Sequence, residues 1–290
     1  MTRPTRSSLG HCTSLARRAR ALGWCWLILV LALPTLAAAA VDVPQGAVAR
    51  WGGGAESCGM DGRTWRALEG VCWYPIDFAR DPGTIEVARW LPGQPMESSW
   101  IRIVDVEFDD QAIDFPDESY VHLSEEDLAR HYREQAEVKP LFRWPPGTPP
   151  RFTLPLQNPA GEPLPEGKYF AVNRSFNGES KNPHTGIDYA IGMDNPTFAV
   201  ADGEVVLVGE HFFSGKSIYI DHGDGLISMY FHLNDYDVAV GDSVKAGDTI
   251  GKIGSSGRST GPHLHLGLRW HRARIDPNRL LGELDVIDIE

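Results

Sequence analysis

The chain has little positive charge for its length. Its 290 residues include 27 Lys+Arg against 39 Asp+Glu, which gives a formal net charge of −12. The only charged residues among positions 1–40 are five arginines, so the rest of the chain has 22 cations against 39 acids and a net charge of −17. Such an acidic surface repels a phosphate backbone and excludes nucleic acid as the expected partner.

Cysteine is also scarce. The chain has four cysteines, and only Cys58 and Cys72 lie beyond residue 40. Two thiolates are too few for a cysteine-bound metal centre. In an oxidising compartment we expect Cys58 and Cys72 to form a disulfide, which stabilises the fold by about 3 kcal/mol in the chain-entropy model. The alternative is a pair of free thiols.

Long apolar runs are limited to one, Leu22–Leu36. It follows an arginine-rich start and precedes Ala38–Ala40, which is the pattern of a secretory signal peptide over residues 1–40, cleaved before Val41. The protein is therefore expected to be periplasmic or secreted, with no stable membrane span after cleavage. The alternative is an uncleaved anchor, because the apolar run and its alanines approach the roughly 20 residues that a span needs.

Helical periodicity is confined to one long segment, from Glu125 to about Phe142. Ser124 precedes it as an N-cap, and Asp127 stands three residues later as in a capping box. The sequence before this helix favours strands, among them 84–90 and 100–106, separated by Gly, Pro and Asp turns. Residues 41–144 are therefore expected to form a smaller β-rich accessory or regulatory module with one long helix.

The remaining chain divides by composition into three segments. Residues 145–166 form a proline-rich connector with extended pieces. Residues 167–281 contain short strands and tight turns, with hairpin signals at Asp202-Gly203 and Asp224-Gly225. This pattern predicts a mostly β catalytic domain, built on an antiparallel sheet with a groove. Residues 282–290 form an acidic tail.

Histidine is present in an informative pattern. The chain contains His184-x-x-x-Asp188, then His232, then His263-x-His265. Zinc in enzymes is typically held by three protein ligands, with water in the fourth position. The set therefore predicts a mononuclear zinc hydrolase. The spacing alone does not tell which member of His263-x-His265 is the ligand.

Strand periodicity places these residues on common faces. In 262–270, His263 and His265 alternate with an apolar set: Leu264, Leu266, Leu268 and Trp270. In 226–232, we expect Ser228, Tyr230 and His232 to share the polar face, and Ile227, Met229 and Phe231 the apolar one. His184 and Asp188 are in phase, with Ile187 and Tyr189 pointing away. Three strands of one sheet could gather these histidine-bearing faces into one groove.

The sequence resembles the lysostaphin/LytM-type zinc endopeptidases at three places: 176–178 with 183–190 (FNG…PHTGIDYA), 221–223 with 230–233 (DHG…YFHL), and 257–265 (GRSTGPHLH). The likeness covers essentially all of residues 167–281. The upstream strand-rich region and helix resemble the N-terminal module of Gram-negative periplasmic members.

The resemblance implies that His184, Asp188 and His265 bind one Zn²⁺ per chain, and that His232 and His263 are unligated catalytic residues. It implies peptidoglycan as the partner and hydrolysis of its peptide cross-links, with the D-alanyl–meso-diaminopimelate bond as the expected target. A glycyl-glycine-cutting enzyme is the enzymatic alternative. A non-catalytic wall-binding or amidase-activating protein is the other, but its signature is missing ligands, and all are present here.

The groove is expected to have two walls, formed by the small-residue loop 254–261 and the aromatic loop 211–215. Candidate substrate contacts are Phe212, Tyr230, Arg258 and Thr260. A further hypothesis is latency, in which the accessory module is autoinhibitory because carboxylates of the acidic stretch 105–118 reach the open metal position. Nothing in the sequence specifies an oligomeric state.

Overall fold

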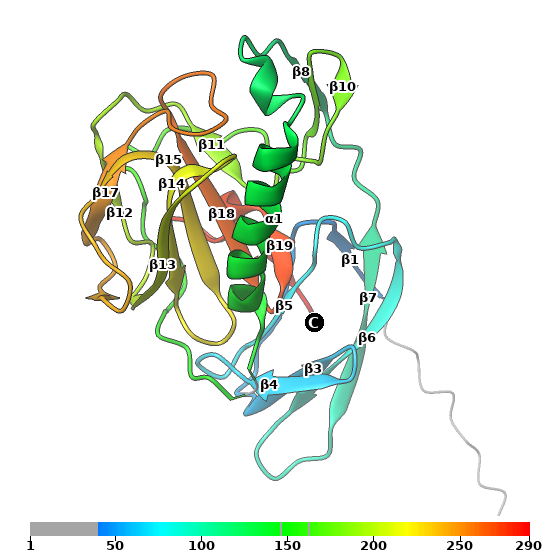
Figure 1. The fold of residues 1–290 in the computed structure, drawn as a ribbon. Helices are drawn as coiled ribbons and strands as arrows, with labels where there is room; N and C mark the ends of the chain where they lie inside the picture. The colour runs from blue at the N-terminus through cyan, green and yellow to red at the C-terminus, as the bar shows by residue number, and fades with distance from the viewer. Residues whose placement is uncertain (1–39, 146, 162) are drawn as a thin grey trace, which may run out of the picture. The chain divides into compact units, whose positions relative to one another are not determined.

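The computed structural model describes residues 40–145, 147–161 and 163–290 (Figure 1). The expected signal peptide lies outside the described residues except for Ala40. The described chain is mostly β, with one α-helix, as the sequence predicts. None of its helices is long and apolar enough to cross a membrane.

The largest sheet is antiparallel and has nine strands. Six follow the path β11-β18-β15-β14-β13-β16, and β12, β17 and β19 join beside it. Their bounds are β11 Ile187–Tyr189, β12 Pro196–Phe198, β13 Gly203–His211, β14 Gly215–Asp221, β15 Ile227–Tyr236, β16 Ser243–Val244, β17 Thr249–Ile253, β18 Leu264–Trp270 and β19 Ala273–Ile275. The Asp224-Gly225 turn joins paired strands as expected, whereas the strand before Asp202-Gly203 pairs with β17 and forms no hairpin there.

One face of this sheet carries the main core. The four alternating apolar residues of β18, from Leu264 to Trp270, are all fully buried in it, together with Ile187 and Tyr189 of β11. The proline-rich connector passes along this side. Its Phe152 ring lies 5.5 Å from the Trp270 ring, and Leu156 donates its backbone N–H to the carbonyl of Leu280.

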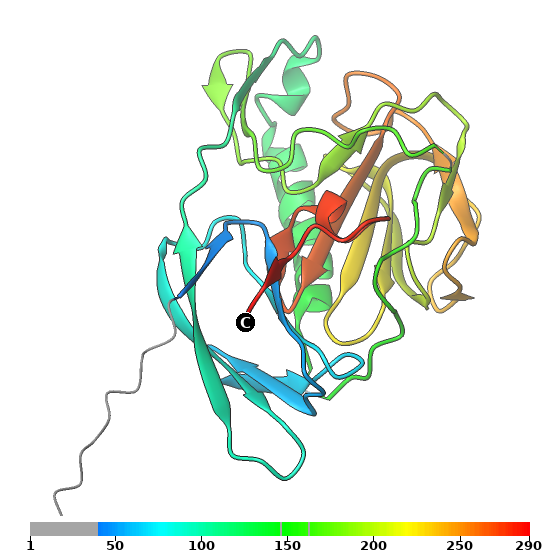
Figure 2. The same cartoon turned by 180° about the vertical axis from the view of Figure 1, so that it is seen from behind.

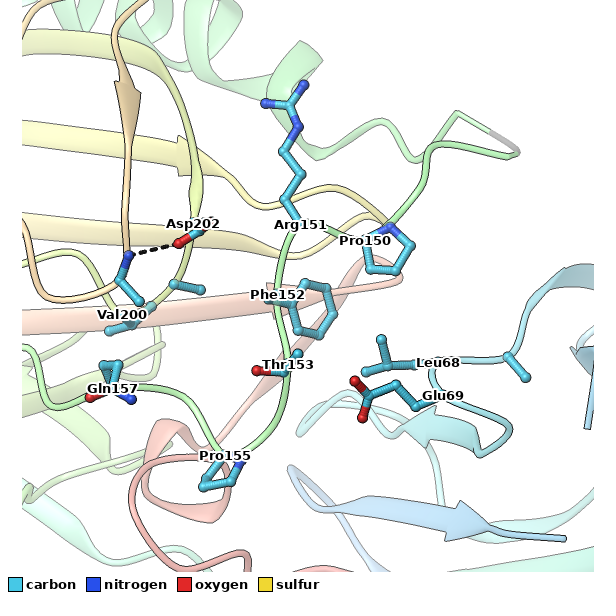
Figure 3. Close-up of a pocket in the computed structure, with 13 residues that line it drawn as sticks. Leu68, Glu69, Pro150, Arg151, Phe152, Thr153, Pro155, Gln157, Val200 and Asp202 are labelled. Carbon is cyan, nitrogen blue, oxygen red and sulfur yellow. Dashed lines mark hydrogen bonds between the residues drawn. The ribbon is translucent and has the colours of Figure 1, made fainter. Parts of the chain in front are cut away.

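The connector also lines a pocket of about 470 Å³, together with residues 67–69, residues 200–202 and Ala246 (Figure 3). Leu68 and Glu69 lie on one side, and Val200 and Asp202 lie on the other, where Asp202 accepts a hydrogen bond from the backbone of Ala246. The connector is therefore a packed part of the fold rather than a free linker.

The opposite face of the sheet is covered by α1, Glu125–Val138, and the 3-10 turn η2, Lys139–Phe142. The helix lies in front of the sheet in Figure 1 and behind it in Figure 2. The Asp127 N–H donates to Ser124 Oγ at 3.1 Å, so the expected N-cap is confirmed. Val138, Leu141 and Phe142 pack on the sheet, but no residue of α1 itself is buried.

The accessory module contains two further sheets. One has the order β1-β7-β6-β3-β4, and the other has the order β20-β2-β5. Their bounds are β1 Val41–Pro44, β2 Val48–Trp51, β3 Ser57–Met60, β4 Arg63–Arg66, β5 Cys72–Pro75, β6 Gly83–Trp90, β7 Glu97–Val104 and β20 Ile287–Asp288. The disulfide between Cys58 and Cys72, with Cα atoms 5.4 Å apart, links β3 to β5 and confirms the expected pairing.

Two strand pairings join distant parts of the sequence. β8, Asp110–Ile113, pairs in parallel with β9, Asn173–Phe176, which also pairs with β10, Glu179–Ser180. β20 pairs in parallel with β2, and Ile289 is buried in the accessory core. Residues 287–289 of the expected acidic tail thus pair and pack with strands from the first part of the described chain. The two remaining 3-10 turns are η1, Glu118–Tyr120, and η3, Pro277–Arg279.

Candidate metal centre and active site

Three neighbouring strands bring the predicted residues together. Asp188 on β11 lies opposite His265 on β18, and His265 lies opposite Phe231 on β15. Residues directly opposite each other in a sheet share a face, so Asp188, His265 and Phe231 line the same side. His184 precedes β11, where its backbone N–H donates to the carbonyl of Val172.

Three side chains converge to form a cluster of possible metal ligands. His184 Nε2 lies 2.7 Å from His265 Nδ1 and 3.1 Å from Asp188 Oδ1. His265 Nδ1 lies 2.9 Å from the same carboxylate oxygen. His184 and His265 are buried and Asp188 is nearly so. Two imidazole nitrogens and one carboxylate oxygen facing one point form a donor set that fits a single divalent cation with an open position.

Backbone carbonyls fix the orientation of three histidine rings. The Nδ1 atom of His184 donates to the Tyr169 carbonyl at 2.7 Å, and that of His263 donates to the Gly261 carbonyl at 2.8 Å. His232 Nδ1 likewise donates to the carbonyl of Ser256 at 2.8 Å. Because a carbonyl only accepts, Nδ1 carries the proton and Nε2 of each ring is left with a free lone pair.

The sequence predicted that Ser228, Tyr230 and His232 share one face of β15, and this prediction is wrong. Ser228 pairs with Leu268 and Tyr230 pairs with Leu266, and both lie on the core side. Ile227, Met229 and Phe231 face α1 and the cluster instead. His232 has a φ of +62°, and the β14–β15 register shifts beside it. This bulge reverses the alternation, so His232 reaches the cluster side although Tyr230 does not.

Two of the four candidate substrate residues lie outside the groove. Tyr230 is fully buried, and its hydroxyl accepts the backbone N–H of Val200 at 2.9 Å. Phe212 is 8% exposed and packs against Tyr120 with ring centroids 4.9 Å apart. Neither side chain lines the groove, so the structure does not bring these two candidates to it.

Arg258 and Thr260 do line the groove. The groove has a volume of about 430 Å³ and borders Asp188, His232 and His263. The Arg258 guanidinium lies between the rings of Phe176 and Phe213, at 4.4 and 4.3 Å from their centroids. Residues 258–261 of the expected loop 254–261 line one wall, whereas no residue of the expected loop 211–215 lines this groove. β8 contributes Gln111 and Ile113 to another wall.

Sequence reasoning missed Arg174 of β9. Its Nη2 donates to Asp188 Oδ2 at 2.8 Å, and its Nε donates to Gln111 Oε1 at 3.0 Å. The pairing of β8 with β9 places Gln111 opposite Arg174. Because this pairing joins residues more than 60 positions apart, no local pattern could reveal the contact.

Burial controls the electrostatics of the cluster. Burial, followed by the nearby His263 and His265, holds the pKa of His232 well below its ordinary value. Burial, followed by the charge of His184, lowers the pKa of His265 to about 4. Burial acts to raise the pKa of Asp188, but hydrogen bonds with His184 and His265 outweigh it and lower that pKa. At neutral pH His232 and His265 are therefore neutral and Asp188 is ionised.

A His/Asp/His cluster on an antiparallel sheet, beside a groove with two further imidazoles, defines the class of metal-dependent hydrolases. Residues 182–277 match peptidase family M23. The crystal structure of a putative peptidase M23 from Pseudomonas aeruginosa is 30% identical with a TM-score of 0.61, and the match covers 80% of this chain and 92% of that one. The chain belongs to peptidase family M23.

Curated relatives match a shorter region. The chain is 42% identical over 94 residues to the DD-carboxypeptidase/endopeptidase Mpg of Neisseria meningitidis serogroup B, covering 32% of this chain and 22% of that protein. It is 40% identical over 83 residues to the peptidoglycan DD-endopeptidase ShyA of Vibrio cholerae, covering 29% and 19%. The match thus spans about a fifth of the length of these relatives.

Proposed function

We propose that the protein is a zinc-dependent endopeptidase that hydrolyses peptide cross-links of peptidoglycan, at the bond between D-alanine and meso-diaminopimelate. The convergence of His184 Nε2, Asp188 Oδ1 and His265 Nδ1 beside an open groove carries the proposal. The names of the relatives Mpg and ShyA support the substrate class. His184, Asp188 and His265 would hold one zinc ion.

When bound, zinc would supply a Lewis acid that acidifies water to a pKa of about 7. His232 and His263 supply the proton transfers. Their rings lie 4.7 Å apart, and His263 Nε2 lies 3.7 Å from Asp188 Oδ1. The Nε2 lone pair of one of the two rings takes one proton from the attacking water. The imidazolium that forms donates a hydrogen bond to the oxyanion and then gives that proton to the leaving amine as the C–N bond breaks.

The groove supports an acidic peptide as substrate. Arg258 forms no ion pair in the described chain, and it is held in place by two aromatic rings. Burial, followed by the nearby charge of Arg174, lowers the pKa of Arg258 to about 10, which still leaves it cationic at neutral pH. An unpaired, oriented guanidinium can bind a carboxylate of the peptide stem. Thr260 is exposed beside it.

The same proposal assigns a role to each segment of the chain. Residues 167–281 would act as the catalytic unit and residues 41–144 as an accessory module, in the periplasm or outside the cell after removal of residues 1–40. No carboxylate of 105–118 bonds to the His184, Asp188 and His265 cluster within the described chain. Autoinhibition would therefore act through β8, which narrows the groove, rather than through an acidic ligand.

The test is a digest of purified diaminopimelate-type peptidoglycan with and without chelator, followed by mass spectrometry of the released muropeptides. Chelator-sensitive conversion of cross-linked dimers to monomers is expected, and the fragment masses identify the bond. Cleavage restricted to glycine-bridged peptidoglycan would replace the proposed bond with glycyl-glycine. Binding to peptidoglycan with no cleavage by the zinc-loaded protein would favour a non-catalytic wall-binding protein.

A further inference from the structure

A second pocket of about 750 Å³ lies between the accessory module and the large sheet. Six of its lining residues are cations, and one of them, Arg80, is paired with Asp61. The other five come from four separate parts of the fold: Arg63, Lys139, Arg143, Arg269 and Arg272. They come from β4, from η2 and its end, from β18, and from the turn after β18. This concentration of positive charge is notable in a chain whose formal net charge is −12.

The carboxylates near the pocket are already engaged. Asp61 accepts two hydrogen bonds from Arg80, at 2.6 and 2.8 Å. Asp77 accepts two from the guanidinium of Arg274, at 2.7 and 2.9 Å. Within the described residues, none of the other five lining cations forms an ion pair. The pocket therefore has a positive charge that the protein itself does not neutralise.

Arg269 is the partly buried member of this set of cations. Its guanidinium lies 3.9 Å from the ring centroid of Phe142 and is partly buried. Burial, followed by the charge of Arg274, lowers the pKa of Arg269 to about 10. Like charges gathered at a desolvated position repel one another, and a bound anion would relieve that repulsion.

Aromatic rings form the rest of the wall. Trp144 packs edge-on against Trp65, with centroids 5.3 Å apart, and stacks on His271 at 3.8 Å. His271 is buried, and its Nε2 lies 2.9 Å from Asp224 Oδ2. Its Nδ1 has no hydrogen-bond partner among the described residues. The pocket thus combines flat apolar surfaces with unpaired cations.

We propose that this pocket binds an acidic peptide that carries two or more carboxylates with apolar groups between them. Carboxylates would bind Arg143, Arg272 and their neighbours, and the apolar groups would pack on Trp65 and Trp144. A bare phosphate anion would leave the aromatic walls uncovered. The peptide stem of peptidoglycan and an acidic segment of a partner protein share this chemistry. The site uses no residue of the metal cluster, so it stands independently of the proposed hydrolysis.

The test measures binding to residues 41–290 by calorimetry in chelator, without any assay of cleavage. The probes are an uncross-linked disaccharide-tetrapeptide muropeptide, a synthetic Glu-Ala-Glu-Ala-Glu peptide, and inorganic phosphate. Binding of either peptide at least tenfold tighter than phosphate is expected. The muropeptide binding alone assigns the wall as the source, and the synthetic peptide binding alone assigns a protein segment. Equal binding of phosphate, or no binding of either peptide at millimolar concentration, overturns the proposal.

A double variant tests the location. Arg143→Gln with Arg272→Gln removes two exposed pocket cations, and Arg66→Gln with Arg133→Gln removes two exposed cations that do not line this pocket. The pocket variant should bind the peptide at least tenfold more weakly, whereas the control should change less than twofold. Equal loss in both variants would mean general charge attraction and no site. Matching thermal unfolding curves show that the variants fold.

Discussion

Arg174 and Asp188 are joined so that the two oxygens of one carboxylate have separate partners. Arg174 donates to Oδ2 at 2.8 Å, while Oδ1 faces His184 and His265. Hydrogen bonds to the outer atom of a ligand fix its orientation and its basicity. Arg174 is thus a positioning residue for the metal cluster.

Replacement of Arg174 should therefore weaken metal binding. Arg174→Gln removes the guanidinium charge and the N–H group that donates to Asp188 Oδ2. We expect the zinc affinity to fall about 10- to 100-fold. Competition with a chromophoric chelator measures this. Arg151→Gln, which alters an exposed cation paired with Glu204, is the matched control. Unchanged affinity in the Arg174 variant would show that Asp188 is oriented without it.

Alanine variants of His263 and His265 should differ in how much zinc they bind. His265→Ala removes a cluster atom and should abolish stoichiometric zinc binding. His263→Ala should keep zinc but lower turnover about 10²- to 10⁴-fold, because a proton-transfer group is lost. Elemental analysis and a muropeptide assay measure the two effects. Zinc loss in the His263 variant alone would exchange the two roles.

Tyr230→Phe should affect stability rather than catalysis. The Tyr230 hydroxyl accepts the N–H of Val200 in the core, so its removal leaves a buried donor unpaired. A cost of about 1–3 kcal/mol in the free energy of unfolding is expected. Denaturant unfolding checks this, and turnover of the zinc-loaded variant at 25 °C should stay within twofold of the original. A large loss of turnover with unchanged stability would place Tyr230 at the substrate after all.

Because His222 is buried, we expect the free energy of unfolding to fall as the pH is lowered. It is fully buried on the core side, and burial lowers its pKa to about 4. An unfolded histidine titrates near 6.5, so the unfolded state takes up the proton first as the pH falls. The His222 contribution is complete above about pH 6.5, and about 2 kcal/mol of it is lost between pH 7 and pH 5.

The comparison uses His222→Gln, which should show a shallower fall of unfolding free energy between pH 7 and pH 5 than the original chain. His122→Gln, at an exposed site, provides the control and should retain the original slope. Parallel curves for all three proteins would mean that His222 does not titrate in this window.

The sequence predicted those features that depend on local periodicity. The alternation of leucine with histidine in β18 predicted both the core face and the His265 side, and the Ser124 cap predicted where α1 begins. The face of Tyr230 was wrong because a single bulge residue, His232, reverses the alternation of β15. Arg174 was missed because no motif marks its contact with Asp188, and its contact with Gln111 depends on a pairing between β8 and β9. Local pattern therefore predicts faces until a bulge or a distant pairing intervenes.

The parallel pairing of β20 with β2 has a consequence for the order of folding. Arg50 and Asp288 form an ion pair across a sequence separation of 238 residues. Contacts with such long separation carry a large loop-closure entropy and form late. The three-stranded sheet β20-β2-β5 is therefore complete only after residues 287–289 have been synthesised and have paired with β2. A change in residues 287–289 would therefore also weaken the packing around β2, far away in the sequence.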